Sequence, residues 1–172
     1  MTRPAEIEEL NALDESGFVE ALGFAFEHSP WVVRRAWAAR PFEGREALHA
    51  AMMAAVAAAE PAERVDLVRA HPELAGKAAI ARTLTASSLG EQASAGLDQL
   101  TEEEFARFHT LNEVYRSRFG FPFIICVRLH DKASILAAME RRLAGTWDDE
   151  LAEAITQVGL ISRLRLSDAV SA

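Results

Sequence analysis

The sequence predicts an all-α fold. Alanine dominates many segments of the 172-residue chain, glycine and proline are modest in number, and apolar residues recur at helical spacing nearly throughout. This length fits one domain that can bury a sizeable core. We therefore expect a single compact helical-bundle domain over residues 1–172, with about eight helices and one short extended segment near residues 121–128.

Capping residues and prolines bound the helices of the first half. Asp14 can cap a helix in which Phe18, Leu22 and Phe26 share one face. Pro30 suits the first turn of the next helix, because its missing N–H has no helical partner there. Such signals predict helices over residues 15–26, 30–39, 45–59 and 61–70, and a weaker helix over residues 72–84 that begins with Pro72.

Capping motifs also mark the second half. Within the helical segment 85–100, Ser88 and Glu91 have the spacing of a capping box, and Thr101 and Glu104 repeat it. Gly120 is a natural C-cap for the helix over 102–119. The predicted apolar stripe of that helix consists of Phe105, Phe108, Leu111 and Tyr115. Two further helices are expected over residues 131–145 and 146–170.

The stretch FPFIICVRL, residues 121–129, is β-branched and aromatic and lacks a helical period. An extended segment in a helical protein leaves backbone N–H and C=O groups that a flat heterocyclic ligand can satisfy. Arg128 ends the segment with a guanidinium group suited to a carboxylate. The alternative is a buried connector with Arg128 in a structural ion pair. We interpret Cys126 as a small core residue rather than a nucleophile.

Composition excludes several classes of function. The formal net charge of −8 argues against nucleic acid and against an anionic membrane surface. A single cysteine favours a reducing compartment, and neither a signal peptide nor a membrane-spanning stretch is evident, so we expect a cytoplasmic protein. No His/Cys/Asp/Glu cluster has zinc spacing and no glycine-rich phosphate loop occurs, so we expect no metal site and no nucleotide site.

His71 stands before Pro72, at the predicted junction of two helices. The positive end of the second helix would favour a neutral imidazole and attract an anion, which suits a proton shuttle. The alternative is an exposed histidine at a helix boundary. Likewise, Ser88 and Glu91 can be caps alone, but the neighbouring Gln92 adds the paired donor and acceptor that recognition of a urea or imide edge requires.

Three segments together resemble one family. HPELAGK, SSLGEQASAGL and FHTLNEVYRSRFGFPFIICVR occur in the order and with the separations of the 2-oxo-4-hydroxy-4-carboxy-5-ureidoimidazoline (OHCU) decarboxylases of uric acid breakdown. EHSPWV, RPF and LISRLRLSDAV are similar to the family at the flanks. The resemblance implies a cofactor-free decarboxylase on an all-helical fold, usually a homodimer, that converts the small molecule OHCU into (S)-allantoin and carbon dioxide.

The resemblance also implies residue roles. His71 matches the family's catalytic histidine, which we expect to act as acid or base with Glu91 orienting it and Arg128 holding the substrate anion or the developing oxyanion. Where Val127 stands, the family often has alanine, a difference of little consequence if the contact is made by backbone. The substrate-binding residues carried over are Pro72, Ser88, Gln92, Phe123, Ile124, Ile125, Cys126 and Val127.

Two other functions remain open from the sequence. The chain can be a non-catalytic helical interaction module, in which His71 marks a helix boundary and Glu91 is a cap. It can also be a related enzyme that acts on another ureido or carboxy-imidazoline compound, since the motifs would look the same.

Overall fold

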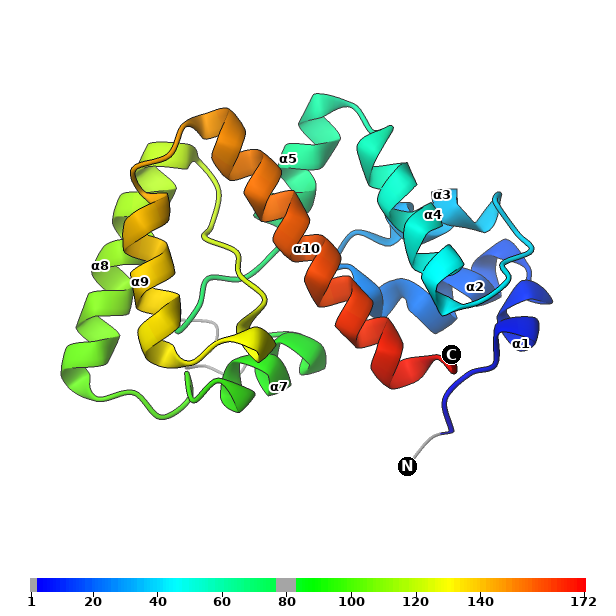
Figure 1. The fold of residues 1–172 in the computed structure, drawn as a ribbon, viewed down its shortest axis with the longest axis horizontal. Coiled ribbons are helices and arrows are strands. Elements are labelled where there is room, and N and C mark those ends of the chain that lie inside the picture. Colours follow the sequence, from blue (N-terminus) through cyan, green and yellow to red (C-terminus); the bar gives the residue numbers. More distant parts are fainter. Residues whose placement is uncertain (1–2, 77–82) are drawn as a thin grey trace. The chain divides into compact units, whose positions relative to one another are not determined.

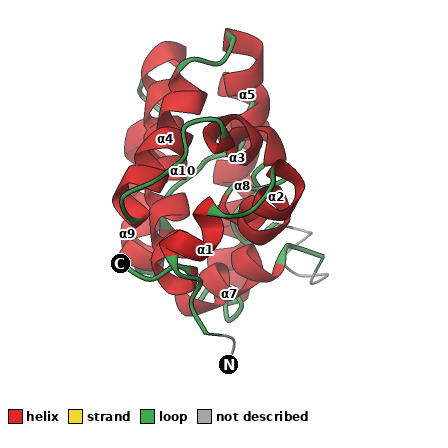
Figure 2. Cartoon of the chain, turned by 90° about the vertical axis from the view of Figure 1, so that its right-hand side faces the viewer, coloured by secondary structure: helices red, strands yellow, loops and turns green. Residues whose placement is uncertain are grey.

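The computed structural model describes residues 3–76 and 83–172, and it confirms the all-α prediction. Figure 2 shows only helices and loops in these two ranges, and one isolated parallel bridge pairs Ala5 with Val170. The chain divides into two compact units: a first unit of Met1–Ala70 with Gly159–Ala172, and a second unit of His71–Val158. The single domain over residues 1–172 therefore stays a prediction.

The first unit begins with helices whose ends follow local capping rules. Asp14 caps α2 by accepting a hydrogen bond from the Gly17 N–H at 2.8 Å, and Pro30 occupies the first turn of α3, as predicted. The first helix was not predicted; it is only five residues long and is closed by a Glu6–Glu9 capping box. The helices are α1 (Ile7–Asn11), α2 (Glu15–Leu22), α3 (Pro30–Trp37), α4 (Arg45–Ala57) and α5 (Pro61–Arg69), with a 3-10 turn, η1, at Gly23–Ala25.

Packing in the first unit joins α2 to α3 and α3 to α4 (Figure 1). The predicted shared face of Phe18 and Leu22 is buried, and so are Leu48, Met52 and Val56, which recur at fourfold spacing on α4. A buried ion pair adds a polar element: Arg165 Nη2 lies 2.9 Å from Glu27 Oε1, and Arg165 Nη1 donates to the Phe24 carbonyl at 3.1 Å. The sequence pattern did not single out this pair.

The second unit contains α7 (Ala86–Ser94), α8 (Glu102–Phe119), a 3-10 turn η2 (Val127–Leu129), α9 (Lys132–Arg142) and the first part of α10 (Trp147–Ala169). Helices α8 and α9 lie side by side (Figure 1). Thr101 and Glu104 form the predicted capping box of α8, and Gly120 ends that helix at φ 77°, in the left-handed region that favours glycine.

The buried stripe of α8 differs from the predicted one. Phe105 is 36% exposed, whereas Asn112 is 4% exposed and takes a place on the inward face. The stripe therefore consists of Phe108, Asn112, Tyr115 and Phe119. Tyr115 packs against three aromatic rings, Phe119, Phe121 and Phe123, with centroids 4.6–6.1 Å apart. An asparagine at a core position of an apolar helix face requires a specific partner, because a buried amide is costly without hydrogen bonds.

Among the helices of the two described ranges, none has both the length and the apolar character that crossing a bilayer requires.

Candidate active site

The loop that carries the predicted catalytic histidine is not the start of a helix. After α5 ends, residues 71–76 form a turn centred on Leu74 and Ala75, which we call the histidine loop. The predicted helix over 72–84 is thus wrong for residues 72–76 and 83–84, and its middle, residues 77–82, lies outside the described residues. His71, 7% exposed, therefore does not precede a helix that begins at Pro72, and the argument from a helix dipole does not apply to it.

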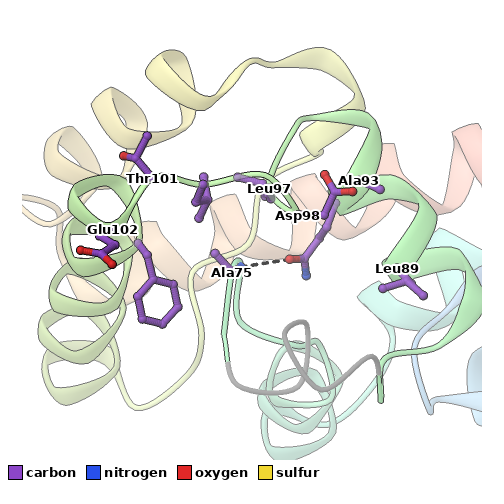
Figure 3. A pocket seen from close by; sticks show the side chains of 10 residues that line it. Ala75, Leu89, Ala93, Leu97, Asp98, Thr101 and Glu102 are labelled. Carbon is purple, nitrogen blue, oxygen red and sulfur yellow. Dashed lines mark hydrogen bonds between the residues drawn. The ribbon is translucent and has the colours of Figure 1, made fainter.

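Side chains from two helices bind the backbone of the histidine loop. Gln92 Oε1 accepts from the Ala75 N–H at 3.0 Å, the bond drawn as a dashed line at Ala75 in Figure 3, and Gln92 Nε2 donates to the Glu73 carbonyl at 3.2 Å. Asn112 Nδ2 donates to the Leu74 carbonyl at 2.8 Å. These bonds replace the helical ones that residues 72–76 would otherwise form, which explains why the sequence prediction failed there.

Helix α7 begins one turn earlier than its sequence motif suggested. Thr85, not Ser88, is the N-cap: its hydroxyl accepts from the Ser88 N–H at 3.3 Å. The predicted capping box of Ser88 and Glu91 is therefore wrong, because Thr85 also has a cap-forming side chain and lies three residues before Ser88. Ser88 is the third residue of the helix and is buried, as is Gln92, and Glu91 is partly exposed.

This register places three predicted site residues on one side of α7. Positions three and four apart in a helix share a face, so Ser88, Glu91 and Gln92 lie together. Glu91 does not form the capping box that the structural alternative required. Gln92 contacts the histidine loop, as described above.

The predicted extended segment is confirmed for residues 121–126, which we call the extended strip. It ends two residues sooner than the predicted 121–128, because Val127–Leu129 form η2, and Arg128 in that turn is exposed. The predicted residues Phe123, Ile124, Ile125, Cys126 and Val127 are all buried. Helix α7 packs against η2, so the structure brings the helix of Ser88, Glu91 and Gln92 next to the turn that holds Arg128.

Buried polar residues that the sequence reading missed support the strip. Arg142 Nη1 donates to the Ile124 carbonyl at 2.7 Å, and Arg142 Nε bonds to Glu150 Oε2 at 2.9 Å. The Tyr115 hydroxyl donates to the same carboxylate oxygen at 2.5 Å; burial, and then this bond, raise the pKa of Tyr115 well above its ordinary value. Nothing in the local sequence MERR distinguishes Arg142, whereas Asn112 was detectable as a polar residue in step with Phe108 and Phe119.

Two pockets flank the histidine loop, and Ala75 lines both. The first, of about 460 Å³, lies between α7 and the start of α8 (Figure 3). The second, of about 550 Å³, is lined by Glu73 and Arg116, which form an ion pair. The first pocket is lined by Ala75, Leu89, Gln92, Ala93, Leu97, Asp98, Leu100, Thr101, Glu102 and Phe105; the second by Pro72, Glu73, Ala75, Gly76, Phe105, His109, Glu113 and Arg116.

The described residues contain no candidate metal-binding site. Residues 3–76 and 83–172 hold no group of three or more His, Cys, Asp or Glu side chains arranged to bind a metal ion.

Comparison with known proteins places the chain in a family. The family model for OHCU decarboxylase matches residues 11–167. The 2-oxo-4-hydroxy-4-carboxy-5-ureidoimidazoline decarboxylase of Haloferax volcanii is 41% identical over 165 residues, which cover 96% of each chain. The mouse protein of the same name is 38% identical over 163 residues, 95% of this chain and 92% of that protein. The uric acid degradation bifunctional protein PucL of Bacillus subtilis is 37% identical, but the match covers only 33% of it.

Solved structures agree with this assignment. An (S)-allantoin synthase matches with a TM-score of 0.75 and 28% identity, covering 96% of this chain and 54% of that one. An OHCU decarboxylase crystallised in the presence of (S)-allantoin matches with a TM-score of 0.68; at 20% identity this supports the fold alone. The family model and the near full-length relatives confirm the resemblance seen in the sequence: the chain belongs to the OHCU decarboxylase family.

Proposed function

We propose that this protein decarboxylates OHCU to (S)-allantoin without a cofactor. The observation that carries the proposal is the gathering of the three family segments around α7. This helix bears Ser88, Glu91 and Gln92, bonds to the loop after His71 through Gln92, and packs against the turn that holds Arg128. Relatives named as OHCU decarboxylases support the same reaction.

The decarboxylation of OHCU determines which tasks such a site must perform. OHCU bears a hydroxyl group and a carboxylate on ring carbon C4, next to the C5=N1 bond whose carbon carries the ureido group. When the C4–carboxylate bond breaks, carbon dioxide leaves, the electron pair of that bond forms a C4=C5 double bond and the C5=N1 π pair moves to N1, which gives an enol at C4. The C4 hydroxyl then loses its proton and becomes the allantoin carbonyl, N1 gains a proton, and C5 is protonated, so the enzyme must orient the carboxylate out of the ring plane, stabilise the charge on the C4 oxygen and deliver a proton to one face of C5. Delivery to one face sets the S configuration.

We assign these tasks to the three segments. His71, oriented by Glu91, holds the substrate hydroxyl group and manages the proton, a task that typically contributes about 10²–10⁴-fold to the rate. Arg128 anchors the carboxylate or stabilises the enolate oxygen, for which its exposed position on η2 is suitable. Gln92 keeps one N–H and one lone pair beyond its bonds to the histidine loop, and with these it can contact the ureido group.

The backbone of the extended strip has a direction that suits substrate recognition. The Ile124 carbonyl and the Cys126 N–H are bound by Arg142 and Gln157, at 2.7 and 2.9 Å. Groups two residues apart in an extended segment point to the same side, so those of Phe123 and Ile125 point to the opposite side. We assign the reading of the imide and ureido edges to Phe123 and Ile125. A homodimer and a cytoplasmic location stay predictions.

Circular dichroism tests the proposal. Urate, urate oxidase and the hydrolase of the pathway generate OHCU in the cuvette, and the protein is then added. Rapid growth of the (S)-allantoin signal is expected, whereas the same mixture without the protein gives slow, racemic decay. Slow racemic decay with the protein would support the non-catalytic module. Faster turnover of another ureido or carboxy-imidazoline compound would support the related-enzyme alternative.

A further inference from the structure

We propose that Asn112 is a positioning residue, which holds the backbone of the histidine loop and thereby sets the place of His71. The inference rests on the proposed function of His71. Asn112 lies in the middle of α8, is 4% exposed, and donates from Nδ2 to the Leu74 carbonyl at 2.8 Å. Leu74 is only three residues after His71, so a shift of this carbonyl moves the histidine.

Packing alone does not explain an amide side chain at position 112. Its orientation follows from its partner, since an amide oxygen facing the Leu74 carbonyl would be repelled. Asn112 Oδ1 then lies buried, and among the described residues it has no hydrogen-bond partner. A buried acceptor without a partner costs stability. Leucine has a similar shape and would remove the unpaired oxygen, but it could not bind the Leu74 carbonyl, so the reason for the amide is its bond to the loop rather than packing.

The histidine loop supplies that reason, because its conformation is unfavourable by itself. Ala75 has φ 52°, in the left-handed region that a residue with a Cβ rarely adopts. Pockets of about 460 and 550 Å³ border the loop at Ala75, which is itself buried. Gln92 and Asn112 together bind backbone groups of three successive residues, Glu73, Leu74 and Ala75. Hydrogen bonds from two helices thus maintain the turn.

Asn112→Leu separates positioning from stability. We expect kcat to fall by about 10- to 100-fold, because a displacement on the order of 1 Å of a catalytic group has an effect of that size. KM should stay within about threefold, since His71 acts mainly in the chemical step. Tm should fall only slightly, since the loss of the donor to the Leu74 carbonyl is partly offset by removal of the unpaired Asn112 oxygen. Wild-type kcat in Asn112→Leu would overturn the inference.

Asn11→Leu is the matched control. Asn11 Nδ2 also donates to a backbone carbonyl, that of Phe42, at 2.9 Å, and Asn11 Oδ1 in addition accepts from the Phe42 N–H at 2.9 Å, but Asn11 belongs to the first unit. The same substitution there should lower Tm and leave kcat unchanged. Losses of kcat that follow the change in Tm in both variants would instead mean that Asn112 acts only through stability, and this too would overturn the inference.

Ala75→Gly provides a rescue. Glycine adopts positive φ without a steric penalty, so the loop needs less support when residue 75 is glycine. Adding Ala75→Gly to Asn112→Leu should restore kcat by several-fold. A double variant no more active than Asn112→Leu would show that the turn at Ala75 is not what Asn112 maintains.

Amide hydrogen exchange at Ala75 distinguishes failure of this inference from failure of the proposed function. The Ala75 N–H is bound by Gln92 Oε1, and its exchange is measured without substrate. We expect exchange at least about tenfold faster in Asn112→Leu, as the local opening becomes easier. An unchanged rate would overturn the inference even if the wild type is active. An inactive wild type would refute the proposed function, and the exchange rate would still decide whether Asn112 holds the loop.

Discussion

The histidine loop and the extended strip solve the same problem in different ways. Both are non-helical backbone in a helical unit, so their N–H and C=O groups need partners from elsewhere. Neutral amides of Gln92 and Asn112 bind the loop, and pockets border it at Ala75. A guanidinium–carboxylate pair, Arg142 and Glu150, binds the strip, and aromatic rings surround it.

The different kinds of hydrogen bond indicate that the extended strip is held more rigidly than the histidine loop. The Arg142 guanidinium also lies 4.4 Å above the Phe123 ring, so charge and packing restrain the same segment. Charge-assisted bonds are about twice as strong as neutral ones, and a buried pair tolerates little displacement. We expect the strip to be a fixed surface for the substrate. The loop backbone is held by neutral hydrogen bonds from Gln92 and Asn112, so we expect its position to be more easily changed.

The largest expected effect concerns the loop. His71→Asn should reduce turnover at least about 10²-fold, towards the background rate, because the proton-transfer group is lost while a polar side chain remains at the buried position. Circular dichroism of (S)-allantoin formation measures turnover, and a thermal melt should show an unchanged fold. Near-normal turnover would remove His71 from the mechanism.

Substitutions that remove the support of the extended strip should lower the stability of the protein. Arg142→Met leaves the Glu150 carboxylate buried without its cation and the Ile124 carbonyl without its donor, so the free energy of unfolding should fall by about 3–5 kcal/mol. Urea denaturation measures it. Adding Glu150→Gln removes the uncompensated charge and should recover part of the loss. A loss below about 1 kcal/mol in the single variant would contradict the picture of a strip held by charge.

Glu91→Gln tests whether the carboxylate on α7, the helix that contacts the histidine loop, has a catalytic or a structural role. Turnover should fall by about 10- to 100-fold if the carboxylate orients His71. Any loss of stability should be smaller than the loss of a helix cap, because Glu91 is not part of a capping box. Thr85→Ala, which removes the actual cap, should cost about 1 kcal/mol in the free energy of unfolding. If Glu91→Gln destabilises as much as Thr85→Ala, Glu91 has a structural role.

The smallest effect is a pH dependence in the strip's support. The pKa of Tyr115 is raised by burial and by its bond to Glu150. The folded state thus holds the phenolic proton more tightly than the unfolded chain does, where the pKa is near 10.0. This contribution to stability is fully present below pH 10 and is lost as pH rises above it. Tyr115→Phe should lose less stability than the wild type between about pH 9 and pH 11 in urea denaturation; equal losses would mean that the phenol does not titrate with unfolding.

Local signals predicted the ends of several helices correctly, because the groups that decide them are neighbours in the chain. Asp14, the Thr101–Glu104 box and Gly120 each act within a few residues. The error at Ser88 is also local: Thr85 can cap α7 as well, and spacing alone does not rank the two. The candidate site residues were found through the family resemblance, and their catalytic roles stay predictions.

The sequence by itself determined the all-α class, the family and the non-helical character of residues 121–126, since helical periodicity, capping chemistry and motif order are written along the chain. Only the tertiary structure decided that Pro72 starts no helix at residues 72–76. The reason is physical: the loop's backbone groups bind Gln92 and Asn112, which are 17 and 38 residues away from their partners Ala75 and Leu74. Competition of that kind depends on which side chains the fold brings together, and a local pattern does not contain it.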